Sequence, residues 1–109
     1  MISEADIERA LNYLRDNAEN DAQAHANMLY LDKWLDVVLA QEQAKAMASS
    51  VAAAKIVAEC SDAYKAALDG YRESVFENKK RQFLRSAAET RIEAWRTMCS
   101  NERAQGKIG

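Results

Sequence analysis

The chain contains no proline and only three glycines, two of which, Gly106 and Gly109, stand in its last four residues. Turns and loops depend on these two residue types, so their scarcity argues against a sheet protein with many hairpins and against a loop-rich enzyme. The plentiful residues are alanine, leucine, glutamate, lysine, arginine and glutamine. These lose little side-chain freedom in a helix, and the sequence therefore predicts an all-α fold.

Cysteine and long apolar runs are also scarce. Cys60 and Cys99 are the only cysteines, and the first ten residues, MISEADIERA, lack the basic and then apolar pattern of a secretory signal. Two thiols without such a signal fit a reducing compartment, so we expect a cytoplasmic protein. No stretch approaches the roughly 20 apolar residues that cross a bilayer, and we expect no membrane association.

Catalytic and metal-binding motifs are missing as well. The sequence has no GxxxxGK[ST] or GxGxxG loop, no HExxH and no paired ExxH, and His25 is its single histidine. Asp21 and His25 share a helix face at a spacing of four residues, which suits either a metal-ligand pair or, more simply, a solvated or capping pair. Asp32 and Asp36 at the same spacing indicate a solvated face. We therefore expect no metal and no cofactor, and predict that the protein is not an enzyme.

Charge is divided unevenly along the chain. Residues 1–70 contain six Lys/Arg and twelve Asp/Glu, a net charge of −6, whereas residues 71–109 contain nine Lys/Arg and five Asp/Glu, a net charge of +4. Such a division favours antiparallel pairing of two helical segments or of two subunits. It is also compatible with a basic end that binds a polyanion.

Helix signals predict a single domain whose first 48 residues form two helices. Ser3 and Asp6 have the spacing of an N-cap and its N3 acid, and open a short helix over 3–18. The polar segment 16–21 is expected to interrupt it, because Asn and Asp compete for backbone hydrogen bonds. A second helix is then expected over 20–48.

A long helical arm is predicted over 50–103, with Ser50 as its N-cap. Val75 and Leu84 both belong to apolar stripes, yet nine residues at about 100° per residue place them on opposite faces of one helix. The arm must therefore meet different partners or break. The candidate breaks lie near residues 61 and 70 and within 77–82, and residues 104–109 are expected to fray.

Apolar side chains recur at alternating spacings of three and four along the second helix and the arm, as in a coiled-coil seam. Beside this seam Tyr30, Trp34 and Val37 form a second stripe, so the apolar face is too wide for one partner helix. A helix of about 28 residues spans roughly 42 Å, and one small chain cannot cover so elongated a face. The sequence predicts an elongated helical hairpin or bundle completed by a homodimer. The expected oligomer interface comprises Met28, Leu31, Trp34, Leu35, Val38, Tyr64, Leu68, Tyr71, Val75 and Trp95.

A basic segment offers an alternative function. Lys79, Lys80, Arg81 and Arg85 lie within two helical turns, with Phe83 among them. Such cations can contact phosphates, and an aromatic ring can stack on a base. The plainer interpretation is a solvated helix face partly neutralised by nearby glutamates, and the overall pI of about 5.4 argues against an autonomous DNA-binding domain.

Residues 81–104, RQFLRSAAETRIEAWRTMCSNERA, about a quarter of the chain, carry a resemblance. This segment resembles the C-terminal part of short helical proteins of tailed bacteriophages and prophages that are encoded near recombination or single-strand-annealing genes. The resemblance implies a phage origin and an accessory role, and no catalytic residue. We expect a protein that binds a phage or host protein as a helical oligomer, with accessory nucleic-acid binding in recombination as the alternative. The matching residues are Leu84, Arg85, Ala87, Ala88, Arg91, Ile92, Glu93, Trp95, Arg96 and Arg103.

Overall fold

The computed structural model describes residues 2–108 of the backbone and the side chains of residues 2–106. Three helices follow one another along the chain: α1 (Glu4–Lys45), α2 (Val51–Glu59) and α3 (Asp62–Ile108). No strand occurs within residues 2–108, and the predicted all-α fold is confirmed.

The start of α1 is fixed by a capping box. The backbone N–H of Asp6 donates to Ser3 Oγ at 3.2 Å, and the backbone N–H of Ser3 donates to Asp6 Oδ2 at 3.0 Å. Each side chain thus satisfies an amide that the first helical turn leaves without an intrahelical partner. The predicted N-terminus is confirmed, and aspartate fills the position that glutamate usually takes.

The predicted break at residues 16–21 is wrong, because α1 is continuous from Glu4 to Lys45. The polar side chains of this region find partners along the helix. Asn17 Nδ2 donates to the Tyr13 carbonyl at 2.9 Å, and Arg15 donates to Asn12 Oδ1 at 3.0 Å. A side chain that is bonded within the helix no longer competes with the helical backbone pattern, so the polar run does not end the helix.

The connection between α1 and α3 contains the short helix α2. Ser50 is its N-cap, with an extended backbone (φ −151°, ψ 164°), and its hydroxyl accepts from the Ala53 N–H at 3.1 Å, as predicted. The chain turns again at Ser61, whose Oγ donates to the Ala58 carbonyl at 2.6 Å and accepts from the Tyr64 N–H at 3.2 Å. Of the candidate breaks in the arm, the one near residue 61 is therefore observed.

The other candidate breaks are not observed, since α3 runs without interruption through Gly70 and through residues 77–82. Gly70 costs the helix only about 1 kcal/mol relative to alanine, too little to end it. The expected fraying from residue 104 is also not observed, because α3 continues to Ile108. Gly109 lies outside the described residues.

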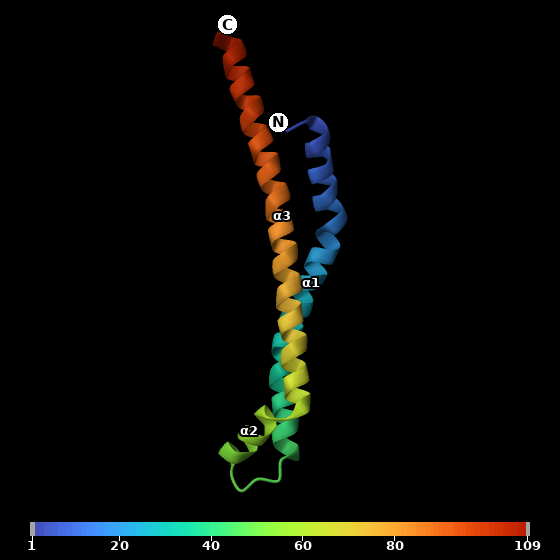
Figure 1. Cartoon of the computed structure of the whole chain (residues 1–109), viewed down its shortest axis with the longest axis vertical. Coiled ribbons are helices and arrows are strands. Elements are labelled where there is room, and N and C mark those ends of the chain that lie inside the picture. Colours follow the sequence, from blue (N-terminus) through green and yellow to red (C-terminus); the bar gives the residue numbers. More distant parts are fainter. Residues whose placement is uncertain (1, 109) are drawn as a thin grey trace. The chain divides into compact units, whose positions relative to one another are not determined.

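Contacts within the chain define two compact units. Unit 1 combines α1 up to Asp21 with α3 from Lys80 onward, and unit 2 comprises Ala22–Lys79 with all of α2. In each unit the α1 and α3 segments run antiparallel and side by side (Figure 1). Both units share α1 and α3, so a single domain over the whole chain stays a prediction.

The core of each unit is built from small side chains. Ile7, Ala10 and Ala88 are buried in unit 1, and Ala24, Val38 and Ala58 are buried in unit 2. Small residues let helix backbones approach closely. Among the described residues, however, no large side chain is fully buried, so most of the apolar side chains retain exposed surface.

Candidate interaction site

The predicted coiled-coil seam lies between helices of the same chain in unit 2. On α1, Val38 is buried, and Met28, Leu31 and Leu35 are half-buried. Asn78 Nδ2 of α3 donates to Met28 Sδ at 3.6 Å, which shows that this side of α1 faces α3. These four predicted interface residues are therefore largely committed to packing inside one chain.

The predicted interface residues of α3 in unit 2 divide in the same way. Tyr64, Tyr71 and Val75 are half-buried, whereas Leu68 is exposed. Their spacing of four to seven residues keeps the first three on the side of α3 that carries Asn78. Within unit 2 the half-buried part of this stripe lies on the side of α3 that meets α1, and its role in an oligomer stays a prediction.

A second apolar stripe of α1 remains exposed. Tyr30, Trp34 and Val37, here called the aromatic face, are 65, 37 and 44% exposed. The rings of Tyr30 and Trp34 stack with centroids 6.4 Å apart and planes 10° from parallel. At about 100° per residue the three side chains fall within about 60° of one another around the helix. Trp34 is thus the one predicted α1 interface residue that belongs to this exposed stripe.

An open groove of about 410 Å³ adjoins the aromatic face. Tyr30 and Leu31 of α1 form one wall, and Glu73 of α3 lies on the other. Gly70 also lines the groove, and a Cβ atom added there would meet no atom within 4 Å. The groove therefore has an apolar wall on α1 and a partly acidic wall on α3.

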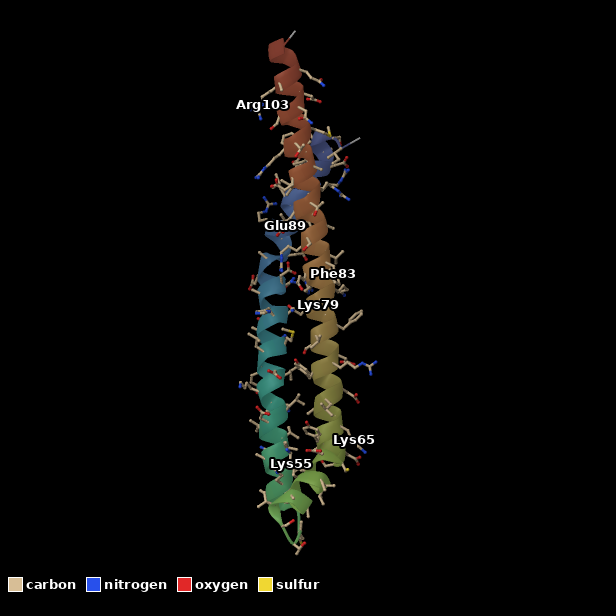
Figure 2. The ribbon with its side chains drawn as sticks, turned by 90° about the vertical axis from the view of Figure 1, so that its left-hand side faces the viewer. Lys55, Lys65, Lys79, Phe83, Glu89 and Arg103 are labelled. Carbon is tan, nitrogen blue, oxygen red and sulfur yellow. The ribbon has the colours of Figure 1, made fainter. Side chains whose placement is uncertain are left out.

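Two other exposed apolar regions lie in unit 2. Phe76, on the outer side of α3, is 69% exposed and shares its face with Lys65, Arg72 and Lys79, of which Lys65 and Lys79 are labelled in Figure 2. The short helix α2 exposes Val51, Ile56 and Val57, and Met47 just before it is exposed as well. The Lys55–Glu59 ion pair (3.9 Å) lies beside Ile56. The first region is apolar but strongly basic, and the second is confined to a short helix.

The basic segment has a structural partner in unit 1 that the sequence did not reveal. Asp21 is only 6% exposed, and its Oδ1 accepts from Arg81 Nη1 at 3.3 Å. Its Oδ2 lies 3.6 Å from Arg85 Nη1. The expected solvated pair of Asp21 with His25 is therefore wrong, since Asp21 is buried and His25 is exposed. Two arginines clamp one carboxylate, which ties α1 to α3.

The remaining members of the basic segment lie at the surface. Lys79 belongs to unit 2, and Lys80 and Phe83 belong to unit 1. All three are exposed, Phe83 to 69%. The segment thus divides into arginines that hold the fold together and lysines that face solvent.

Trp95 occupies a different setting at the far end of α3 in unit 1. It is half-buried and borders an open groove of about 770 Å³ together with Cys99 and Arg103. Beyond this point α3 projects past the N-terminal end of α1, as both views show (Figures 1 and 2). Trp95 therefore belongs to unit 1, whereas the other predicted interface residues belong to unit 2.

The described residues contain no group of three or more His, Cys, Asp and Glu residues placed to hold a metal ion. No described helix is long and apolar enough to span a membrane. The pKa of Asp6 is lowered, chiefly because the backbone N–H of Ser3 donates to its carboxylate, and this shift belongs to the helix cap.

Comparison with protein-family models, with curated proteins and with solved structures gives no match to this sequence.

Proposed function

We propose that this protein acts without catalysis, by binding other proteins as a helical oligomer. The observation that supports this is the exposure of its apolar side chains. Tyr30, Phe76 and Ile56 are each more than 60% exposed, and no large side chain of the described residues is fully buried. Tyr30 belongs to a contiguous stripe, the aromatic face, where its ring stacks on that of Trp34, and contiguous exposed apolar surface on a folded chain marks sites of association.

The partner is proposed to be a phage or host protein in the cytoplasm of a bacterial cell. This part of the proposal rests on the resemblance of residues 81–104 to short helical phage and prophage proteins encoded near recombination genes. An affinity-tagged full-length chain, recovered from infected or expressing cells, is expected to bring a second protein with it. Recovery of the chain alone under several buffer conditions would contradict a heterologous partner.

Self-association is tested separately. Light scattering coupled to size-exclusion chromatography, with samples from about 1 to 100 μM, is expected to give a dimer of twice the 12.2 kDa chain mass. A dimer held by apolar contacts should persist when salt is raised, because screening acts on charges and not on apolar burial. A monomer at every concentration would refute the oligomer.

Accessory nucleic-acid binding is the second candidate function. It is favoured by the exposure of Phe83 with Lys79 and Lys80 nearby, and it is disfavoured by the pairing of Arg81 and Arg85 with Asp21. Phosphate binding weakens steeply with salt, so filter binding of single- and double-stranded DNA at about 50 and 200 mM salt is the direct test. No retention at the lower salt would refute this function.

A further inference from the structure

We propose that the aromatic face of α1, formed by Tyr30, Trp34 and Val37, is the surface on which a second copy of this chain docks. The inference rests on the proposed self-association and states where on the chain it occurs. It also replaces the coiled-coil seam as the centre of the interface, because Val38 is buried and Met28 faces α3 within one chain.

The composition of the aromatic face suits contact with itself. At about 100° per residue it continues along α1 through the uncharged residues Gln23, Ala26, Asn27 and Gln41, and Lys33 and Lys45 lie at its margins. Gln23 Nε2 donates to Asn27 Oδ1 at 3.1 Å, so these polar neighbours are already hydrogen-bonded to each other. In a two-fold contact the same patch meets its own copy, and the uncharged residues at its centre do so without like-charge repulsion.

The whole chain exposes more surface than a folded monomer of its mass is expected to expose, and a second copy could bury this excess. The chain exposes 8165 Å². A folded monomer of this mass is expected to expose about 6,100 Å², which leaves an excess of about 2,100 Å². Two copies burying that excess would hide about 4,200 Å² together, within the range of about 2,000 to 5,000 Å² that obligate dimers bury.

The other exposed apolar regions suit a second copy less well. The outer face of α3 in unit 2 carries Lys65, Asp69, Arg72, Phe76 and Lys79 at alternating spacings of four and three. Three cations against one carboxylate would repel their own copies in a two-fold contact. The nine-residue helix α2 is too short to supply the roughly 800 Å² per partner that a specific interface needs.

The test compares matched charge insertions on the two faces of unit 2. Tyr30→Glu and Val37→Glu place a carboxylate in the aromatic face, and Phe76→Glu places one at a side chain of similar exposure on the outer face of α3. Concentration-dependent light scattering gives the dissociation constant of each full-length variant. Each aromatic-face variant is expected to raise it at least 10-fold and the pair at least 100-fold, whereas Phe76→Glu changes it less than 3-fold. Circular dichroism confirms that helicity is retained, and Tyr30→Ala, expected to weaken association about 10-fold, replaces any variant that does not fold.

Trp34 supplies a local readout of the same contact. In a Trp95→Phe background its emission reports on α1 alone, and dilution through the dissociation constant is expected to shift that emission to longer wavelength and increase its quenching by acrylamide. Unchanged Trp34 emission across a transition seen by light scattering would overturn the docking site while leaving self-association intact. So would weakening by Phe76→Glu with no effect of Tyr30→Glu or Val37→Glu. A wild-type monomer throughout would overturn both proposals.

Discussion

Replacing Asp21 by alanine is expected to destabilise the fold by about 1–3 kcal/mol, because it leaves two arginines beside a site built for a carboxylate. The carboxylate of Asp21 is 6% exposed, and the guanidinium groups of Arg81 and Arg85 approach it to 3.3 and 3.6 Å. Asp21→Asn keeps the shape and one hydrogen-bond acceptor but removes the charge. Its cost should therefore fall at the lower end of the range.

The magnitude follows from competing terms. Two unit charges about 4 Å apart attract by about 4 kcal/mol at an effective dielectric constant near 20. Most of this gross attraction is offset by the desolvation of Asp21 and by the ordering of two long side chains. Arg81 is 25% exposed and Arg85 is 41% exposed, so both regain water when the carboxylate is removed. The net coupling should be about 1–2 kcal/mol for Arg81, and smaller for the more exposed and more distant Arg85.

A double-mutant cycle measures these couplings directly. Urea unfolding of wild type, Asp21→Ala, Arg81→Ala and the double variant is followed by circular dichroism, at one protein concentration because an oligomer makes stability concentration-dependent. Arg91→Ala, on the exposed surface of the same helix, serves as the control partner and should show no coupling. Additive effects of the Asp21 and Arg81 substitutions, within about 0.3 kcal/mol, would refute the clamp.

Three further predictions concern the helix ends and the interior of α3. Ser50→Ala removes the hydroxyl that caps α2 and should lower the free energy of unfolding in urea by about 1 kcal/mol. The control Ser49→Ala should lower it little, and equal losses in the two variants would contradict the cap. Gly70→Ala should stabilise the chain by about 0.5–1 kcal/mol, since the backbone there has no positive φ and the added Cβ meets nothing within 4 Å. Destabilisation would contradict the open space around this residue. The pKa of Asp6, followed by NMR, should lie below 3.8 and rise only partly in Ser3→Ala, because that variant loses the hydroxyl but keeps the backbone N–H that chiefly lowers the pKa. The ionised cap then stabilises α1 above pH 3.8, and this stabilisation is lost as the pH falls through the lowered pKa. A wild-type pKa that is not lowered would contradict the cap.

The sequence predicted the helix boundaries wherever a boundary depends on a capping hydrogen bond between residues close in the chain. Ser3 and Ser50 each present an oxygen to a backbone amide three residues on, and both caps are confirmed. It failed at residues 16–21, because the same residue types either end a helix or bond along it. Whether Asn17 bonds to the Tyr13 carbonyl is decided by the continuation of the helix, which no local pattern reveals.

The candidate site was predictable in part. Spacing alone identified Tyr30, Trp34 and Val37 as a stripe distinct from the coiled-coil seam. It did not show which of these two stripes of α1 packs against α3. That depends on the antiparallel pairing of segments about fifty residues apart, shown by Met28 and Asn78. The sequence likewise could not show that Asp21 is buried, because a carboxylate between arginines of a distant helix has the same local pattern as a solvated one.

The Asp21 clamp also separates the two candidate functions. The net charges of −6 and +4 on the two parts of the chain suit either antiparallel pairing or a polyanion, and the clamp is one direct instance of pairing. A phosphate that binds Arg81 or Arg85 must compete with a carboxylate already held by both. Asp21→Ala should therefore lower stability under either function, but raise retention of DNA at low salt only if these arginines contact phosphate. A variant that loses stability without gaining retention would assign the arginines to the fold and leave protein binding as the function that the surface supports.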